Sequence, residues 1–178
     1  NLPAVQLLEV YGPKRFSGEL RSAGLPLSFP PTVEPNLALI LGGTGTRLDQ
    51  LVVGYSAFAR AGKTASLRFR PDQELEEHVL LSPGSAWIIR RILSGQSRPD
   101  LDPRAYLSAS PALAWKTGTS YGFRDAWAVG IGPRYLIGVW VGRPDGTPVA
   151  GQFGRASAEP LLLQVHDLLV NRDAQQNI

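Results

Sequence analysis

Cysteine is absent from the 178-residue sequence, and histidine occurs only twice. Without cysteine the chain has no disulfide bond and no thiolate metal site. The two histidines, His78 and His166, are far apart in the sequence, so a histidine-based metal site is not predicted either. We therefore expect neither a metal nor another cofactor.

Long hydrophobic runs and clusters of one charge are also missing. The longest apolar stretch, LALIL, is five residues long, far short of the roughly 20 that span a bilayer. The net charge is +3, and the basic residues are scattered singly or in pairs. These patterns predict no nucleic-acid partner and no membrane contact by this segment. The 43% of apolar residues is typical of a globular domain.

Helical patterns dominate about the first 100 residues. Proline near the start, glycine at the end or apolar residues at helical spacing predict helices at residues 3–12, 13–24, 46–62 and 82–95. In the last of these, we expect three apolar residues to point inward and two arginines outward. They are Ile88, Ile89 and Ile92 or Leu93, with Arg90 and Arg91 on the wet face. The proline-rich residues 26–36 are predicted to form an extended loop.

The pattern changes to strands in the second part of the chain. Residues 113–119, 125–131 and 135–142 predict three successive antiparallel strands joined by short turns. A final helix is predicted over residues 157–170, with Ser157 as its N-cap and one buried stripe, Leu161, Val165 and Leu168. Helices before and after a run of strands indicate an α+β fold, helical over about 1–100 and with the sheet and final helix over about 110–171.

Lys116 is one of only three lysines, and it precedes the small polar residues Thr117, Gly118, Thr119 and Ser120. At the edge of a sheet such a strand offers an extended peptide free backbone groups. Glycine allows close approach, hydroxyls can bind a carboxylate, and lysine attracts it. The alternative interpretation is a surface strand with a solvated lysine and threonines that suit a sheet.

Three motifs extend this pattern: WKTGTS, RDAWAVGIG and YLIGVWVG. Together they resemble the penicillin-binding protein transpeptidases, of the serine acyl-transferase and β-lactamase-like superfamily. In that family a Lys-Thr-Gly strand is followed by Asp-x-Trp and Val-Trp-Val-Gly strands. The stretches LILGGTGTRLDQLVVGYSAFARAGK, LLSPGSAWIIRRILSG and GRASAEPLL resemble its helices, and NLPAVQLLE resembles the residues after its Ser-x-Asn motif. The resemblance implies a penicillin-binding transpeptidase domain, of which this chain is the C-terminal part.

The resemblance implies three catalytic residues. Asn1 corresponds to the Asn of Ser-x-Asn and is expected to hydrogen-bond the substrate amide and the missing lysine of Ser-x-x-Lys. Lys116 is expected to keep positive potential in the cleft. The backbone N–H of Thr119 is expected to be one donor to the oxyanion, with the N–H of the nucleophilic serine as the other.

Four residues of the same strand are expected to bind substrate. They are Thr117, Gly118, Thr119 and Ser120. Hydroxyls would bind the ligand carboxylate, and Gly118 would keep the wall flat. The later Asp125 and Trp127 are interpreted as structural, Trp127 as core and Asp125 as a local cap or partner. The glycine-rich residues 42–46 lack the Gly-Lys-Ser/Thr ending of a phosphate-binding loop, so no nucleotide site is predicted.

The family's nucleophile is missing from the sequence. It is the serine of Ser-x-x-Lys, but no serine here has lysine three residues later; Ser85 is followed by Ile88, and Ser120 by Phe123. Both the nucleophile and the first serine of Ser-x-Asn are therefore expected upstream of Asn1. The 178 residues are predicted to be a single partial domain, the C-terminal part of a transpeptidase domain.

The implied function is part of a D,D-transpeptidase that cross-links peptidoglycan through a serine acyl-enzyme. The expected partners are stem peptides of the D-Ala-D-Ala type, β-lactams and the missing N-terminal part of the parent, which would include a glycosyltransferase. The expected location is extracytoplasmic, on the periplasmic side of the inner membrane, with the anchor outside this chain. Two alternatives remain: a penicillin-sensing or catalytically silent peptidoglycan-binding domain, and a serine β-lactamase or D,D-carboxypeptidase.

Overall fold

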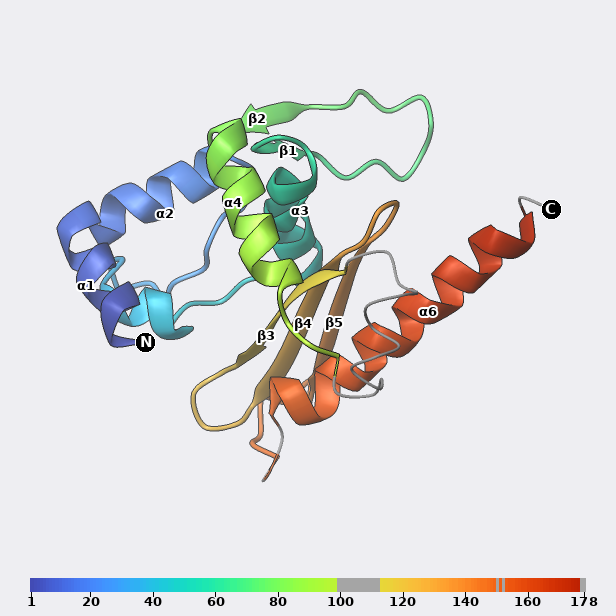
Figure 1. Ribbon diagram of the computed structural model, residues 1–178. Coiled ribbons are helices and arrows are strands. Elements are labelled where there is room, and N and C mark those ends of the chain that lie inside the picture. Colours follow the sequence, from blue (N-terminus) through green and yellow to red (C-terminus); the bar gives the residue numbers. More distant parts are fainter. Residues whose placement is uncertain (99–112, 150, 152, 177–178) are drawn as a thin grey trace.

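The computed structural model describes residues 1–98, 113–149, 151 and 153–176 (Figure 1). Its α+β class agrees with the sequence prediction, because helices flank an antiparallel sheet. The helices are α1 (Leu2–Tyr11), α2 (Pro13–Ser22), the 3₁₀ helix η1 (Leu37–Leu41), α3 (Leu48–Ala59), α4 (Pro83–Ser94), the π-helical turn η2 (Gly154–Ala158) and α6 (Glu159–Gln176). The strands are β1 (Lys63–Ala65), β2 (Glu77–Val79), β3 (Ala114–Thr119), β4 (Asp125–Ile131) and β5 (Leu136–Gly142).

The three-stranded sheet has the order β3-β4-β5, with both pairs antiparallel. The three strands predicted from the sequence are confirmed to within one residue at each end. Gly118 lies opposite Trp127, which in turn lies opposite Trp140. Since directly opposed residues share a face of the sheet, this register decides which side chains meet each flanking layer. In the described residues β3 pairs only with β4, so it is an edge strand.

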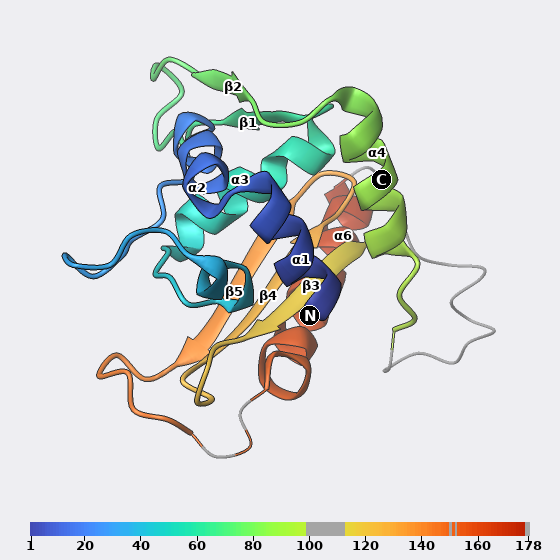
Figure 2. The same ribbon diagram turned by 90° about the vertical axis from the view of Figure 1, so that its left-hand side faces the viewer.

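Helices cover both faces of the sheet, with α6 on one side and α3 on the other (Figures 1 and 2). On the α6 side, a Cβ placed on Gly130 would lie 3.1 Å from the nearest side-chain carbon of Leu162. On the α3 side, a Cβ on Gly138 would lie 2.5 Å from Val52. Both helices therefore sit directly on glycines of the sheet. Trp115, whose side chain is 1% exposed, belongs to the α6 core.

The predicted buried stripe of α6 is wrong. Its three residues are exposed: Leu161, Val165 and Leu168. Instead, Leu162, Leu163 and His166 are buried against the sheet. Either set has helical spacing because this segment is apolar on more than one side. The empty volume above Gly130 accepts Leu162, and that contact selects the face.

The predicted N-cap of this helix is also wrong. The turn η2 runs directly into α6, so the chain is already helical at Ser157. The Ser157 N–H donates to the carbonyl of Phe153 at 2.9 Å, and Phe153 is the residue that precedes the turn. A glycine at position 154 begins this turn, and its role is described below with the site.

Helix α4 has a narrower buried stripe than predicted. Ala86 is buried, and Ile89 and Leu93 are half-buried, which agrees with the prediction of Ile89 and of Leu93 as the alternative to Ile92. Ile92 is exposed, and so is Ile88, against the prediction. Arg90 is half-buried rather than outward, whereas Arg91 is exposed and lies over the ring of Trp87. The buried face of α4 follows from its spacing, because Ala86, Ile89 and Leu93 are three and four residues apart. Ile88 and Ile92 fall between its turns.

Two short elements escaped sequence analysis, namely η1 and the β1–β2 hairpin. Each strand of the hairpin has three residues, too few for an alternating pattern to be visible. His78, one of the two histidines, lies in β2 and is exposed. The hairpin joins α3 through Gly62, which has φ +90° and approaches the Leu81 carbonyl so closely that a Cβ would lie 2.0 Å from its oxygen.

Candidate functional site

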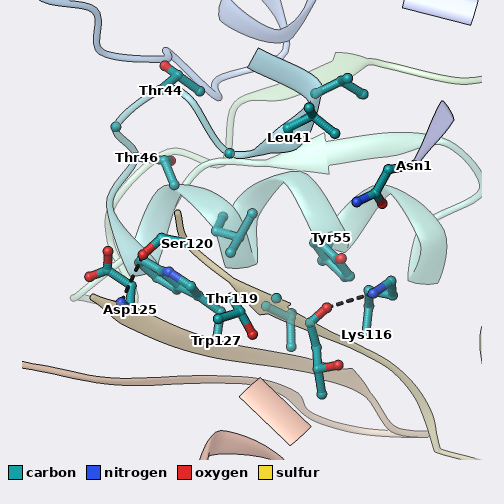
Figure 3. Close-up of a pocket in the computed structure, with 17 residues that line it drawn as sticks. Asn1, Leu41, Thr44, Thr46, Tyr55, Lys116, Thr119, Ser120, Asp125 and Trp127 are labelled. Carbon is teal, nitrogen blue, oxygen red and sulfur yellow. Dashed lines mark hydrogen bonds between the residues drawn. The ribbon is translucent and has the colours of Figure 1, made fainter. Parts of the chain in front are cut away.

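A cleft of about 730 Å³ lies between β3, the N-terminus of the chain, α3 and the loop after η1 (Figure 3). All six residues predicted to be catalytic or substrate-binding line it: Asn1, Lys116, Thr117, Gly118, Thr119 and Ser120. The fold therefore brings Asn1 to the same cavity as a strand that begins more than 110 residues later. The structure brings these six residues together, and their roles remain predictions.

On the side away from β4, β3 has no neighbouring strand among the described residues. Ser120 N–H donates to the Asp125 carbonyl of β4 at 3.0 Å, which fixes the direction of its backbone groups. Because N–H and C=O groups alternate in direction along a strand, those of Thr117 and Thr119 point away from β4. The Trp115 carbonyl follows the same alternation and accepts a hydrogen bond from the Gln96 side chain. An extended ligand beside β3 would therefore meet the backbone of Thr117 and Thr119.

Lys116 places its charge at this edge. Its side chain is exposed, and its Nζ donates to the Thr117 carbonyl at 2.6 Å (Figure 3). Among the described residues no carboxylate lies within ion-pair distance of this ammonium group. The positive charge is consequently not neutralised within the described chain, and it can attract an anionic ligand.

Gly118 is not required by the packing of the described residues. A Cβ built there would meet only the Cβ of Trp127, at an ordinary 3.7 Å. Its φ also lies outside the left-handed region. The opposite holds for Gly154, where a Cβ would lie 2.3 Å from the Gly118 carbonyl oxygen. Helix packing therefore explains Gly154 but leaves Gly118 to another cause.

Hydroxyl groups at the end of β3 already have one protein partner each. Thr119 Oγ1 accepts a hydrogen bond from the Gly154 N–H at 3.0 Å, and Ser120 Oγ accepts one from the Asp125 N–H at 2.9 Å. Both hydroxyls act as acceptors in these bonds, so each keeps its own proton to donate to a ligand oxygen. The contact with Gly154 also ties the end of β3 to the start of the last helical segment.

Asp125 and Trp127 are both interpreted from the sequence as structural residues, and the structure agrees with this for Asp125 but not for Trp127. Asp125 is paired locally, as expected, because its Oδ1 accepts a hydrogen bond from Trp140 Nε1 at 2.8 Å. Trp127 is not a core residue: it is half-buried, lines the cleft and lies near the Trp140 ring, at 6.3 Å between ring centroids. The fully buried tryptophan of the sheet is Trp115. Alternation explains the correction, since Trp127 shares the face of Gly118.

Asn1 precedes α1 but does not cap it. Its backbone carbonyl accepts the Val5 N–H at 3.1 Å, while its side chain makes no capping hydrogen bond. Asparagine at this position usually satisfies a free N–H of the first turn with its side chain. Here the exposed amide instead lies at the cleft (Figure 3).

A second wall faces β3, and sequence analysis assigned it no role. It is the glycine-rich loop, residues 42–46, which contributes Gly42, Thr44, Gly45 and Thr46 to the cleft. Paired backbone hydrogen bonds of 2.8 and 2.9 Å hold Gly45 against Ser28, and Thr44 Oγ1 donates to the Ser28 carbonyl at 2.9 Å. The run of glycines before a helix was the available signal, but only the fold shows what it faces.

Helix α3 lines the cleft with Leu51 and Tyr55. Burial raises the pKa of the Tyr55 phenol, so this group stays protonated in the neutral pH range. In the described part of the chain, no three His, Asp or Glu side chains gather in a way that could hold a metal ion. No helix among the described residues is both long and apolar enough to cross a membrane.

Comparison with known proteins gives the family. No family model matches the chain. The sequence is 58% identical to penicillin-binding protein 1C of Escherichia coli over 174 residues, which are 98% of this chain and 22% of that protein. The chain is related to the penicillin-binding proteins. The motifs NLPAVQLL and WKTGTSYGFRDAWAVG indicate the same 1C type.

Other penicillin-binding proteins match at lower identity. Penicillin-binding protein 1B of Vibrio cholerae is 29% identical, over 83% of this chain and 20% of its own. The chain thus spans about a fifth of the length of these two relatives. Among solved structures, penicillin-binding protein 1A of Haemophilus influenzae has a TM-score of 0.63, 17% identity, and covers 86% of this chain and 30% of its own. A peptidoglycan glycosyltransferase of Burkholderia ambifaria has a TM-score of 0.57 and 20% identity, and the match covers 79% of this chain and 52% of that structure's chain. These two likenesses concern the fold alone.

Proposed function

We propose that the chain forms one wall of a D,D-transpeptidase cleft, as the C-terminal part of a transpeptidase domain. The ligands proposed are peptidoglycan stem peptides ending in D-Ala-D-Ala, and β-lactams, which resemble such an ending. The full protein would act outside the cytoplasm and be anchored by a segment not in this chain. The nucleophilic serine would come from another segment, since none of the serines here has lysine three residues later.

The open edge of β3 carries this proposal. It combines three features. Lys116 has no carboxylate partner among the described residues, and the backbone groups of Thr117 and Thr119 point away from β4. Gly118 has room for a side chain, so packing within the described chain does not require glycine there. Peptide ligands commonly bind by adding a strand to such an edge, so that their main chain is hydrogen-bonded and a small residue gives them room. A merely solvated surface strand would explain the lysine and the threonines, but it would not explain Gly118.

The cleft residues would act at defined points of acyl transfer. A serine oxygen attacks the carbonyl of the penultimate D-Ala, the terminal D-Ala leaves as an amine, and an acceptor amine then takes the acyl group. The outward N–H of Thr119 would stabilise the oxyanion formed at each attack. Lys116 would hold the carboxylate-bearing end of the donor, and the Asn1 amide would hydrogen-bond the donor's backbone.

Substitution of Lys116 tests this proposal in the full-length protein that carries the chain. We expect Lys116→Ala to slow acylation by penicillin by about two orders of magnitude, the scale of losing one preorganised electrostatic contact. Lys116→Arg should restore only part of the rate, because a guanidinium is wider and needs a different pocket. Second-order rate constants with a fluorescent penicillin give the comparison.

Lys14→Ala is the matched control, since Lys14 lies on α2 and pairs with Glu34 outside the cleft. It should acylate at the wild-type rate. A folded Lys116→Ala protein that also acylates at the wild-type rate would show that Lys116 is only surface charge. The lifetime of the adduct separates the enzyme classes, because a transpeptidase keeps the penicilloyl group whereas a β-lactamase hydrolyses it quickly.

A further inference from the structure

Tyr55 lies on the wall of the cleft opposite β3, at a position that the transfer mechanism above does not use. It belongs to α3, and its half-buried ring lines the cavity together with Leu51. The ring stands edge-on to Phe58, with centroids 5.5 Å apart and an interplanar angle of 86°. This contact supports one side of the ring.

The Tyr55 hydroxyl makes no hydrogen bond to any residue in the described part of the chain. In contrast, Tyr135 donates to Asp173 at 2.7 Å on the α6 side of the molecule. The Tyr55 hydroxyl is not fully buried, so it is accessible to a ligand in the cleft. Figure 3 shows the Tyr55 hydroxyl directed toward the part of the cleft where Lys116 and Asn1 lie.

We propose that the Tyr55 hydroxyl donates a hydrogen bond to an oxygen of the peptide-like ligand held along β3, and so acts as a binding residue of the cleft. This rests on the proposed function, which supplies a ligand rich in carbonyl and carboxylate oxygens. The ligand is then held from two sides, by the edge of β3 and by the phenol on α3. A ring supported on one side before binding loses less entropy when it makes the bond, which favours a contact of this kind.

The chemistry favours a donor role over an acceptor or ionic one. Burial raises the pKa of the phenol, so the group remains neutral and keeps its proton. Lys116 lines the same cleft, and its ammonium group would attract the carboxylate end of the ligand. Tyr55 then has the remaining oxygens of the ligand as acceptors, within a cleft of about 730 Å³.

Tyr55→Phe tests the proposal in the full-length protein, because it removes only the hydroxyl and keeps the ring contact with Phe58. We expect the second-order rate constant of acylation by benzylpenicillin to fall about threefold to tenfold, as for one lost neutral hydrogen bond. The loss should appear in the concentration dependence of acylation, as weaker binding, and should be the same from pH 6 to pH 9. The melting temperature should not change.

Two further variants make the result decisive. Tyr135→Phe, which loses a hydroxyl outside the cleft, should acylate at the wild-type rate. If Lys116→Ala loses acylation while Tyr55→Phe binds benzylpenicillin as tightly as the wild type, the proposal for Tyr55 is wrong and the proposed function stands. If neither substitution affects acylation, the proposed function itself fails. An equal loss in Tyr135→Phe would indicate a general structural effect and would overturn the role of Tyr55.

Discussion

Gly154 packs against the backbone carbonyl of Gly118 in β3, and the two glycines have different surroundings. Packing explains the glycine at 154, whereas the glycine at 118 is explained by function. Gly154 approaches the Gly118 oxygen from the α6 side, where no side chain fits. Gly118 itself has free space on the opposite side, within the cleft. The neighbours of Gly118 in the sequence predict its importance, but nothing in the sequence around Gly154 does the same. That contact joins residues 36 positions apart, and no local pattern shows it.

Gly118→Val should therefore leave the fold intact while it blocks the cleft. Valine suits a strand better than glycine, and the nearest atom to the new Cβ is at 3.7 Å. We expect the full-length protein to keep or raise its melting temperature and to lose acylation by penicillin. Calorimetry and labelling with a fluorescent penicillin measure the two effects.

Gly154→Ala is the comparison for this experiment, because it should lower the stability of the fold, whereas Gly118→Val should keep or raise it. Its new Cβ would lie 2.3 Å from a backbone oxygen, so the helix or the strand must shift. We expect a loss of about 1–3 kcal/mol in the free energy of unfolding, the usual cost of overpacking. Unchanged acylation in a destabilised Gly118→Val protein would contradict the functional explanation of Gly118.

At the scale of elements, the sheet was predictable and the helix faces were not. Three strands in succession repeat with a period of two residues, and short turns between them leave few other arrangements. In contrast, α4 and α6 carry apolar residues around much of their circumference, so periodicity allows more than one buried face. Tertiary contacts decide between these faces, as Leu162 above Gly130 does for α6.

Neighbouring leucines of α6 provide a direct test of the observed face. Leu162 is fully buried, whereas Leu161 is 45% exposed. We expect Leu162→Ala to lower the free energy of unfolding by about 2–5 kcal/mol, the range for a large buried side chain. Leu161→Ala should cost much less, since its side chain already contacts water. Equal losses in urea denaturation would mean that the face of α6 is not the one described.

The α6 face also contains a titratable group, His166, which is 2% exposed. Burial lowers its pKa, and the charge of Arg98 adds to this effect, while Asp167 opposes it. The unfolded chain then binds a proton more readily than the folded one. The stabilising contribution is complete above the ordinary histidine pKa of about 6.5 and is lost as pH falls through the lower folded value.

We accordingly expect the free energy of unfolding to decrease between pH 7 and pH 5, and His166→Gln to make this decrease smaller. His78→Gln, at an exposed position of β2, is the control. Urea denaturation at several pH values measures the slopes. A slope that His166→Gln leaves unchanged would assign the pH dependence to other groups.

At the scale of the whole molecule, the site combines segments that are distant in the sequence. The resemblance to the family predicted that Asn1 and Lys116 act together, and the fold places both at one cleft. The loop of residues 42–46 and Tyr55 were not predicted. Both lie in a stretch that resembles the family, but only the packing of α3 against the sheet shows that they line the cavity.

The isolated 178-residue chain should not be labelled by a fluorescent penicillin. None of its serines has lysine three residues later, so none has the activating base of this family. Gel fluorescence after incubation with the probe, with the full-length protein as positive control, is the measurement. Covalent label mapped by mass spectrometry to any serine of the isolated chain would disprove the proposal that the nucleophile lies elsewhere.

The pairing of β3 with β4 has a consequence for how the length of this region can vary. Lys116 and Gly118 share one face of the sheet, while Trp115 shares the other face with the α6 core. Removing a single residue from the turn after Ser120 would move every later pair by one position and exchange the two faces of β4. Trp127 would then enter the α6 layer, and its small neighbours would line the cavity. Insertions and deletions in this turn should therefore be tolerated only where the pairing is preserved, even though the turn itself lies at the surface.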